Sequence, residues 1–224
     1  MNLEPLLLSV RLAATVSAIL LVIALPLAYA IAFPRWRGKF IFESIVALPI
    51  VLPPTVLGFY VLIALGPRGF FGRLWQSLFG HTLAFTFSGL VLASILYSLP
   101  FAVQPLIASF ESLDRKLLDA SAILGASRSR TFFSVILPLS WPGVITALVL
   151  SFAHTLGEFG VVLMVGGNLP GITRTVSIQI YDQVQSLDYV GAQRTAFLLL
   201  IVSFALLAFV YGTIRRAWTP WRAR

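Results

Sequence analysis

The sequence contains no cysteine, two histidines and only eight acidic residues among its 224. Without cysteine, the chain has no disulfide, no thiol nucleophile and no cysteine ligand for zinc. Charged residues make up 11% of the chain, against about 25% in a typical soluble domain. This scarcity of charge excludes an ordinary cytosolic enzyme. The 58% apolar content and the mean hydropathy of +0.94 instead indicate an integral membrane protein with several spans.

The motifs of nucleotide-binding and hydrolytic enzymes are also missing. The sequence has no GxxxxGK[ST] loop and no GxGxxG turn to cradle phosphates, and it has no serine-hydrolase elbow. We therefore expect a chain that is not an enzyme, hydrolyses no ATP and holds no cofactor of its own. No internal repeat of 20–50 residues is evident.

A membrane-spanning helix needs about 20 mostly apolar residues. Five stretches meet this requirement, and we predict an all-α membrane protein of about five transmembrane helices in a single domain covering residues 1–224. The first stretch is far longer than the apolar core of a signal peptide and follows no basic segment, so it is predicted to be a retained span. The predicted spans are 6–33, 40–65, 83–109, 141–165 and 197–214.

The segments between the predicted spans are polar. The segment 170–194 is too polar to span, and its core at 175–190 has the pattern of an amphipathic helix at the membrane surface. The positive-inside rule predicts an outer amino terminus and a cytoplasmic carboxyl terminus. Eleven of the 16 basic residues fall on the predicted inner side: Arg35, Arg37, Lys39, Arg115, Lys116, Arg128, Arg130, Arg215, Arg216, Arg222 and Arg224. The other five are Arg11, Arg68, Arg73, Arg174 and Arg194. This placement explains the net charge of +8 without a nucleic-acid partner.

Two ionisable residues fall within the fourth predicted span. His154 and Glu158 are four apart and would share a face of a continuous helix, as a hydrogen-bonded pair in the bundle interior. A metal site is disfavoured because no third ligand is nearby. Glu158 stands between Gly157 and Gly160, which allow close backbone approach or a break in the helix. An intramembrane carboxylate usually faces a cavity or a partner. Glu158 either lines or braces a transport path, or it lies near the interface and is solvated.

The second predicted span is punctuated by prolines at Pro49, Pro53 and Pro54. Proline removes a backbone donor and kinks a helix, and a kinked helix suits the wall of a pathway that moves. Prolines are also common in spans that have no such role.

The polar segment 111–140 is the most informative part of the sequence. Apolar residues recur at helical spacing from Leu113 to Leu124, Gly125 interrupts them, and a basic stretch follows. The pattern predicts a short amphipathic helix, a glycine turn and a second helix that stops before Pro138. Such a segment either docks into a groove of a soluble partner or rests on the lipid headgroups.

This segment resembles the coupling loop in the permease subunits of bacterial ABC importers, which has the pattern E-A-A-x-x-x-G-x(9)-I-x-L-P. Every spacing of the pattern is kept, with Asp for Glu, Ser for the second Ala and Val for Ile. The matching residues are Asp119, Ala120, Ser121, Gly125, Val135, Leu137 and Pro138. The regions 48–72 and 151–182 and the final span are similar to molybdate permeases, and sulfate permeases share the sequence LGEFG at 156–160.

The resemblance implies the type I importer permease fold, in a multi-pass protein of the bacterial inner membrane that works as a homodimer. Two copies of a separate cytoplasmic ATPase would bind ATP and Mg²⁺, and a periplasmic molybdate-binding protein would deliver the cargo. Docking on the ATPase would fall to Asp119, Ala120, Ser121, Gly125, Leu137 and Pro138. The residues themselves, apart from the resemblance, make Glu158, His154, Pro53 and Pro54 the candidates for lining the path or bracing the bundle. Arg128 and Arg130 would contact the ATPase or simply anchor the inner side.

The cargo implied is molybdate, with tungstate, sulfate or thiosulfate as alternatives. Arg68, Arg73 and Arg174 on the outer side would attract an anion or the binding protein, or would simply be solvated. The rival hypothesis is a stand-alone carrier or channel, although such carriers usually hold several intramembrane ionisable groups and internal repeats.

Overall fold

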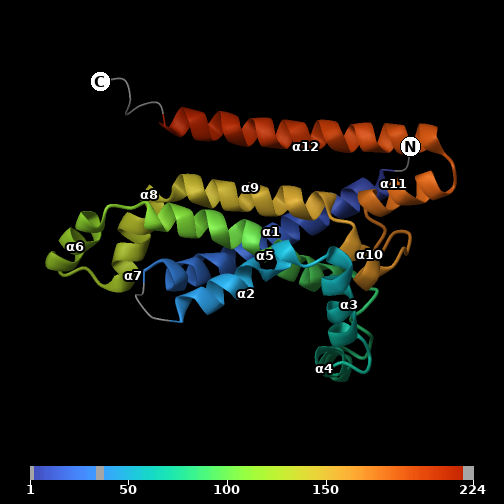
Figure 1. Ribbon diagram of the computed structural model, residues 1–224, viewed down its shortest axis with the longest axis horizontal. Helices are drawn as coiled ribbons and strands as arrows, with labels where there is room; N and C mark the ends of the chain where they lie inside the picture. The colour runs from blue at the N-terminus through green and yellow to red at the C-terminus, as the bar shows by residue number, and fades with distance from the viewer. Residues whose placement is uncertain (1–2, 34–37, 219–224) are drawn as a thin grey trace.

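The computed structural model describes residues 3–33 and 38–218, and within these ranges it is helical with no strand. Helices α1, α5 and α9 form the centre of the bundle, because each packs against the other two. Figure 1 shows α12 running along the outside of α9, with α3 and α4 projecting from one end. The elements are α1 (Glu4–Ala32), α2 (Lys39–Val51), α3 (Pro54–Leu65), α4 (Phe70–Phe79), α5 (Phe87–Glu111), α6 (Arg115–Ile123), α7 (Arg128–Thr131), the π-helical η1 (Phe132–Ile136), α8 (Leu137–Leu139), α9 (Trp141–Gly157), α10 (Gly160–Gly166), α11 (Val176–Gln185) and α12 (Tyr189–Trp218).

Small residues on α1 allow the central helices to pack closely. Ala13, Ser17, Ala24 and Ala28 are buried along one face of α1. Short side chains let helix backbones approach each other closely. In a membrane the lipid tails are as apolar as the side chains, so helices associate through such close packing rather than through the hydrophobic effect. Larger side chains, such as the fully buried Leu106 of α5, fill the space between them.

Three helices are long and apolar enough to cross a membrane by themselves: α1, α5 and the part of α12 from Tyr189 to Phe209. Two further spans form only if bent pairs of helices are counted together. One pair is α2 with α3, bent by 110°, and the other is Arg128–Leu139 with α9, bent by 73°. The prediction of about five transmembrane helices therefore agrees with the structure, with two of the five broken.

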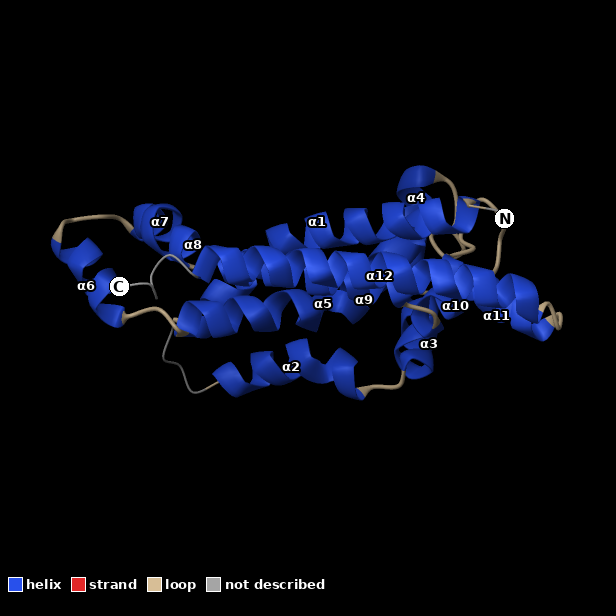
Figure 2. Cartoon of the chain, turned by 90° about the horizontal axis from the view of Figure 1, so that it is seen from above, coloured by secondary structure: helices blue, strands red, loops and turns tan. Residues whose placement is uncertain are grey.

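The predicted span 40–65 is interrupted rather than merely kinked. Leu52 and Pro53 have extended backbones, with ψ near 135° at both. Each of them precedes a proline, and the ring of the following proline disfavours the helical conformation. The helix therefore ends at Val51 and restarts at Pro54. Figure 2 shows α2 lying along the bundle and α3 turning away from it.

Other predicted boundaries shift for local reasons. The span predicted at 83–109 begins only at Phe87, because Phe85 has a positive φ of 64° and the Thr86 hydroxyl accepts a hydrogen bond from the Gly89 amide. The span predicted at 141–165 divides into α9 and α10 at Glu158. The surface helix predicted at 175–190 ends at Gln185, and α12 begins at Tyr189, eight residues before the span predicted at 197–214.

The prediction that a helix stops before Pro138 is wrong. The helix continues through the proline to Leu139, because η1 widens the turn before it and the Leu137 amide donates to the Phe132 carbonyl five residues back. Proline has no N–H and its ring clashes with the carbonyl four residues earlier. A π turn accommodates this, and the sharp bend falls at Ser140.

Candidate functional site

Two regions of the structure hold the residues that the sequence singled out. The first is the coupling segment, residues 111–140, whose helix α6 stands at one end of the molecule beyond α5 and α9 (Figure 1). α6 begins after Asp114, whose carboxylate accepts a hydrogen bond of 3.0 Å from the Lys116 amide. An acceptor at this position satisfies one of the free amides at the start of a helix.

Gly125 ends α6 in a left-handed conformation, with φ of +75°. Its amide donates to the Ala122 carbonyl, and the next amide, of Ala126, donates to the Ser121 carbonyl. This is the Schellman arrangement, in which a residue with positive φ satisfies the last carbonyls of a helix, and glycine adopts it without steric cost. The turn directs the chain into α7, where the Ser127 hydroxyl accepts a hydrogen bond of 3.3 Å from the Arg130 amide.

The motif residues divide between the projecting helix and its base. Asp119 and Ala120 are exposed on α6, whereas Ser121 is buried and its hydroxyl lies 2.8 Å from the Thr131 hydroxyl. Ser121 is one of the positions that depart from the family pattern, and the departure adds a hydrogen bond between α6 and α7. Leu137 is half-buried and Pro138 exposed at the base of the segment, where η1 leads toward α9.

The apolar residues of the coupling segment face two directions. Leu113 and Leu118 pack against the hydrophobic core of the bundle. Ile123 and Leu124, in contrast, are 85% and 86% exposed at the tip of α6. The sequence pattern treated Leu113–Leu124 as one stripe and did not single out Ile123. An exposed apolar pair at the tip of a projecting helix is a surface suited to a partner protein. The exposed Arg115 and Lys116 lie at the opposite end of α6.

The second region is the contact between two helix breaks, the one between α2 and α3 at Leu52–Pro53 and the one between α9 and α10 at Glu158. Glu158 follows the last residue of α9 and is only 5% exposed, so the structure buries it rather than leaving it solvated. Its two carboxylate oxygens accept hydrogen bonds from the Val161 amide at 2.7 Å and the Val162 amide at 3.0 Å. The carboxylate therefore satisfies the first free amides of α10 and fixes how α10 leaves α9.

α10 packs directly against α3, so the helices that follow the two breaks are in contact with each other. A Cβ atom added at Gly160 would lie 2.6 Å from Cβ of Pro54, and one added at Gly58 would lie 2.8 Å from Cβ of Met164. Both distances are shorter than any normal carbon contact. Glycine is thus required at Gly160 by the nearness of Pro54, and the structure brings Glu158 and Pro54, far apart in sequence, into one neighbourhood.

His154 belongs to a different set of contacts. Its Nδ1 lies 2.9 Å from the Ser98 hydroxyl, and its ring stacks on Phe101 with centroids 3.9 Å apart. Ser98 also bonds to the Thr155 hydroxyl at 2.9 Å. His154 therefore joins α9 to α5. The predicted pairing of His154 with Glu158 is replaced by separate partners, because the helix ends at Gly157 and four-residue spacing no longer brings the two side chains together.

The loop of residues 167–175 is held by hydrogen bonds of its own side chains and to α11. Nε of Arg174 donates to the Asn168 side chain at 2.6 Å, and Asn168 donates to Asp182 at 2.6 Å. Arg174 also lies 3.7 Å from the Asp182 carboxylate. Arg174 is thus engaged in bracing the loop on α11 rather than projecting as a solvated cation. Arg68, Arg73 and Arg194 are exposed.

Of the remaining basic residues, Arg215 and Arg216 belong to the last turns of α12. Arg11 lies on α1 with its guanidinium 4.6 Å from the centre of the Phe87 ring. Lys39 bridges Glu111 at 2.8 Å and Glu43 at 3.4 Å, which joins the start of α2 to the end of α5. Arg35, Arg37, Arg222 and Arg224 lie outside the described residues. Within residues 3–33 and 38–218, no three His, Asp or Glu side chains are grouped to hold a metal ion.

Comparison with known proteins identifies the family of this chain. The family described as "Binding-protein-dependent transport system inner membrane component" matches residues 13–224. The chain belongs to this family. It is therefore a multi-pass inner-membrane permease subunit of an ABC transporter rather than an enzyme, and the stand-alone carrier or channel is set aside.

The relatives of this permease include proteins of molybdenum transport systems. It is 49% identical to the "Molybdenum transport system permease protein ModB" of Azotobacter vinelandii, over 93% of this chain and 92% of the relative. The protein of the same name in Escherichia coli (strain K12) is 39% identical over 88% of this chain and 87% of its own length. The expected resemblance to molybdate permeases is confirmed.

The fold is that of solved importer permeases. A chain of the MetNI methionine ABC transporter in an inward-facing conformation matches with a TM-score of 0.75 and 15% identity, over 96% of this permease and 94% of that chain. A chain of a bacterial ABC transporter that imports alginate matches with a TM-score of 0.73 and 18% identity, over 96% and 80%. At these identities the likeness establishes the fold, and the predicted type I importer permease fold is confirmed.

Proposed function

We propose that this permease carries molybdate across the inner membrane as part of an ATP-driven importer. The observation that carries the proposal is the 49% identity to a molybdenum transport permease over nearly the whole of both chains. In the proposed assembly, two copies of the permease sit on two copies of a cytoplasmic ATPase, and a periplasmic binding protein delivers the anion. The amino terminus lies outside and the carboxyl terminus in the cytoplasm, as the distribution of basic residues favours.

In this proposal the coupling segment transmits the motion of the ATPase. ATP and Mg²⁺ are bound by the ATPase, and this chain contributes a rigid element that follows the closing of the ATPase dimer. Three features support this role for α6: its capped ends, the fixed turn at Gly125, and the exposed apolar residues Ile123 and Leu124 at its tip. The hydrogen bond between Ser121 and Thr131 makes α6 and α7 move together.

The two helix breaks are proposed to form the moving part of the permease. A displacement of α9 would pass to α10 through Glu158 and from α10 to α3 through the close contact of Gly160 with Pro54. Interruptions in spanning helices are tolerated where protein or a polar cavity satisfies the backbone, and Glu158 supplies that satisfaction here. His154, bonded to Ser98, holds α9 to α5 while this happens.

Sulfate is the second candidate cargo. A chain of Chlorella vulgaris named "Probable sulfate transport system permease protein cysT" is 39% identical over 77% of this chain, although this chain covers only 64% of that protein. Tungstate and molybdate are both small tetrahedral dianions and would use the same path. Molybdate is preferred because one relative named for molybdenum transport matches at the higher identity of 49%, and two such relatives are covered over 92% and 87% of their own length.

The experiment is ATP-dependent uptake by the reconstituted transporter. The permease is purified with its ATPase, placed in liposomes and supplied with the binding protein and radioactive molybdate outside. We expect accumulation that requires both ATP and the binding protein and that a thousandfold excess of sulfate does not suppress. Uptake of radioactive sulfate at a comparable rate would refute molybdate as the cargo. Uptake without an ATPase would refute the proposed energy coupling.

A further inference from the structure

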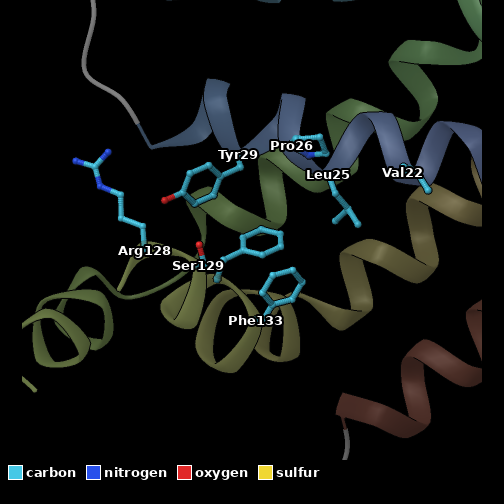
Figure 3. A pocket seen from close by; sticks show the side chains of 8 residues that line it. Val22, Leu25, Pro26, Tyr29, Arg128, Ser129 and Phe133 are labelled. Carbon is cyan, nitrogen blue, oxygen red and sulfur yellow. The ribbon is translucent and has the colours of Figure 1, made fainter. Parts of the chain in front are cut away.

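An apolar groove lies between the last third of α1 and the π-helical turn that follows α7 (Figure 3). Its volume is about 510 Å³, and its apolar walls come from Val22, Leu25 and Pro26 of α1 and from Phe132 and Phe133 of η1. The groove is open on its flank, where the Val22 side chain is 73% exposed. It is separate from the surface at the tip of α6 and from the meeting of the two helix breaks.

The polar side chains that line the groove gather at one end of it. Figure 3 shows Tyr29, Ser129 and Arg128 on one side of the view and Val22, Leu25 and Pro26 on the other. Contacts with the rings of Phe33 and Phe132 hold the Tyr29 ring in place. In the part of the chain that the structure describes, the Arg128 guanidinium makes no salt bridge and the Tyr29 and Ser129 hydroxyls make no hydrogen bond.

The position of the groove along α1 indicates its depth in the membrane. α1 is long and apolar enough to span a membrane, and Val22 lies ten residues before its end at Ala32. At 1.5 Å per residue this is about 15 Å along the helix, so the apolar end of the groove lies at the depth of lipid chains. Arg128 and Ser129 belong to the polar coupling segment, at the level of the headgroups.

We propose that this groove binds one anionic phospholipid of the cytoplasmic leaflet per permease chain. An acyl chain lies along Val22, Leu25 and Pro26, and the phosphate meets the Arg128 guanidinium with the Ser129 and Tyr29 hydroxyls beside it. The cation and two hydroxyls at one end of the groove are complementary to a phosphate, and the apolar walls of the groove are complementary to an acyl chain. Basic pockets on the cytoplasmic side of membrane helices recognise headgroups in the same way. The choice of leaflet rests on the proposed function, since it requires the coupling segment to face the cytoplasm.

The headgroup contact is tested by native mass spectrometry of the purified permease–ATPase complex in detergent. Phosphatidylglycerol and phosphatidylcholine are titrated separately, and bound lipid is counted for the wild type, Arg128→Gln and Arg130→Gln. Arg130 is the matched control, because it is an exposed arginine of the same short helix that does not line the groove. We expect Arg128→Gln to weaken phosphatidylglycerol binding about fivefold, as expected from losing one basic contact. Arg130→Gln should leave binding unchanged.

The contact with the acyl chain is tested with a fluorescent label at a single chosen position. Because the chain has no cysteine, one introduced cysteine is the only site that the label modifies. A bimane label is placed on Val22→Cys in the groove, or on Phe204→Cys at an exposed site of α12 as control. Dibrominated phosphatidylglycerol at a few molecules per complex should quench the label at position 22 and not at 204. In Val22→Trp, which fills the apolar end, binding of phosphatidylglycerol should fall.

Four results would overturn the proposal. These are equal binding of the two lipids, equal effects of Arg128→Gln and Arg130→Gln, equal quenching at positions 22 and 204, and a groove label that lipid never quenches. The last result would mean that protein, either the ATPase or a second copy of the chain, covers the groove. Neither assay measures transport, so failure of the lipid site is distinguishable from failure of molybdate as the cargo.

Discussion

The contact between α3 and α10 can be tested with Gly160→Ala. The added Cβ atom would lie 2.6 Å from Cβ of Pro54 and 3.5 Å from its Cγ. The first distance is about 1 Å shorter than the optimum for two carbon atoms. Pro54 cannot move the atom aside by changing rotamer, because its Cβ belongs to a ring fixed to the backbone. The two helices must therefore separate, and overpacking of this kind costs about 1–3 kcal/mol.

Gly157→Ala is the matched control, because it lies on the other side of Glu158 and its added Cβ atom meets nothing within 4 Å. For a chain of this length, each kcal/mol shifts the melting temperature by about 2–4 °C. In purified protein we expect Gly160→Ala to melt about 2–12 °C below the wild type. Gly157→Ala should melt within about 2 °C of the wild type, since its only effect is a small change in chain entropy.

A double-mutant cycle identifies the cause of this destabilisation. Pro54→Gly removes the atom that the new methyl group strikes, so adding Gly160→Ala to Pro54→Gly should cost less than adding it to the wild type. Strictly additive melting shifts would contradict the proposed contact. Equal melting of Gly160→Ala and Gly157→Ala would refute the close packing of the two breaks altogether.

Three further predictions concern the coupling segment and the buried carboxylate. Gly125→Ala should reduce ATP-driven uptake while leaving the protein inserted. A residue with a side chain is destabilised by about 1–2 kcal/mol at the φ of +75° found here, and relief of this strain would shift α6. Gly80→Ala is the control, because Gly80 has the same φ at the end of α4, and this variant should leave uptake intact. Leu124→Ser should weaken co-purification of the ATPase several-fold without changing the melting temperature, whereas Ile172→Ser, an exposed residue of the loop 167–175, should not affect co-purification. Glu158→Gln should destabilise the permease by about 1–3 kcal/mol, measured by thermal melting, because an amide cannot accept from both backbone N–H groups as the carboxylate does.

Each of these predictions has a result that contradicts it. Equal uptake by Gly125→Ala and Gly80→Ala would mean that the turn does not set the position of α6. Undiminished recovery of the ATPase with Leu124→Ser would exclude the tip of α6 from the interface. Unchanged melting and uptake in Glu158→Gln would mean that neither the charge nor the second hydrogen bond of the carboxylate matters.

The sequence predicted best those features that depend on a few neighbouring residues. The spacing of the coupling motif located the turn at Gly125, because a positive φ at the end of a short helix is a local requirement. The prolines at 53 and 54 predicted an irregularity in the second span for the same reason. The bend of 110° was beyond prediction, since the direction of α3 depends on its packing against Met164 and Gly160 of α10.

The partners of Glu158 could not be predicted because they depend on where a helix ends. Four-residue spacing pairs His154 with Glu158 only if the helix is continuous, and α9 stops at Gly157. Nor did the sequence indicate that Ser98, 56 residues before His154, would bond to it. At Pro138 the general rule that proline stops a helix failed, because a π turn removed the clash.

Molybdate as the cargo is tested most directly by measuring cell-associated molybdenum in a strain that lacks this gene. The strain is compared with its parent at trace molybdate, with and without a large excess of sulfate. If the permease carries molybdate, accumulation collapses in the deletion strain, is restored by the wild-type gene, and is barely reduced by sulfate in the parent. Full competition by sulfate, or failure of the deletion strain to grow on sulfate, would contradict molybdate as the cargo.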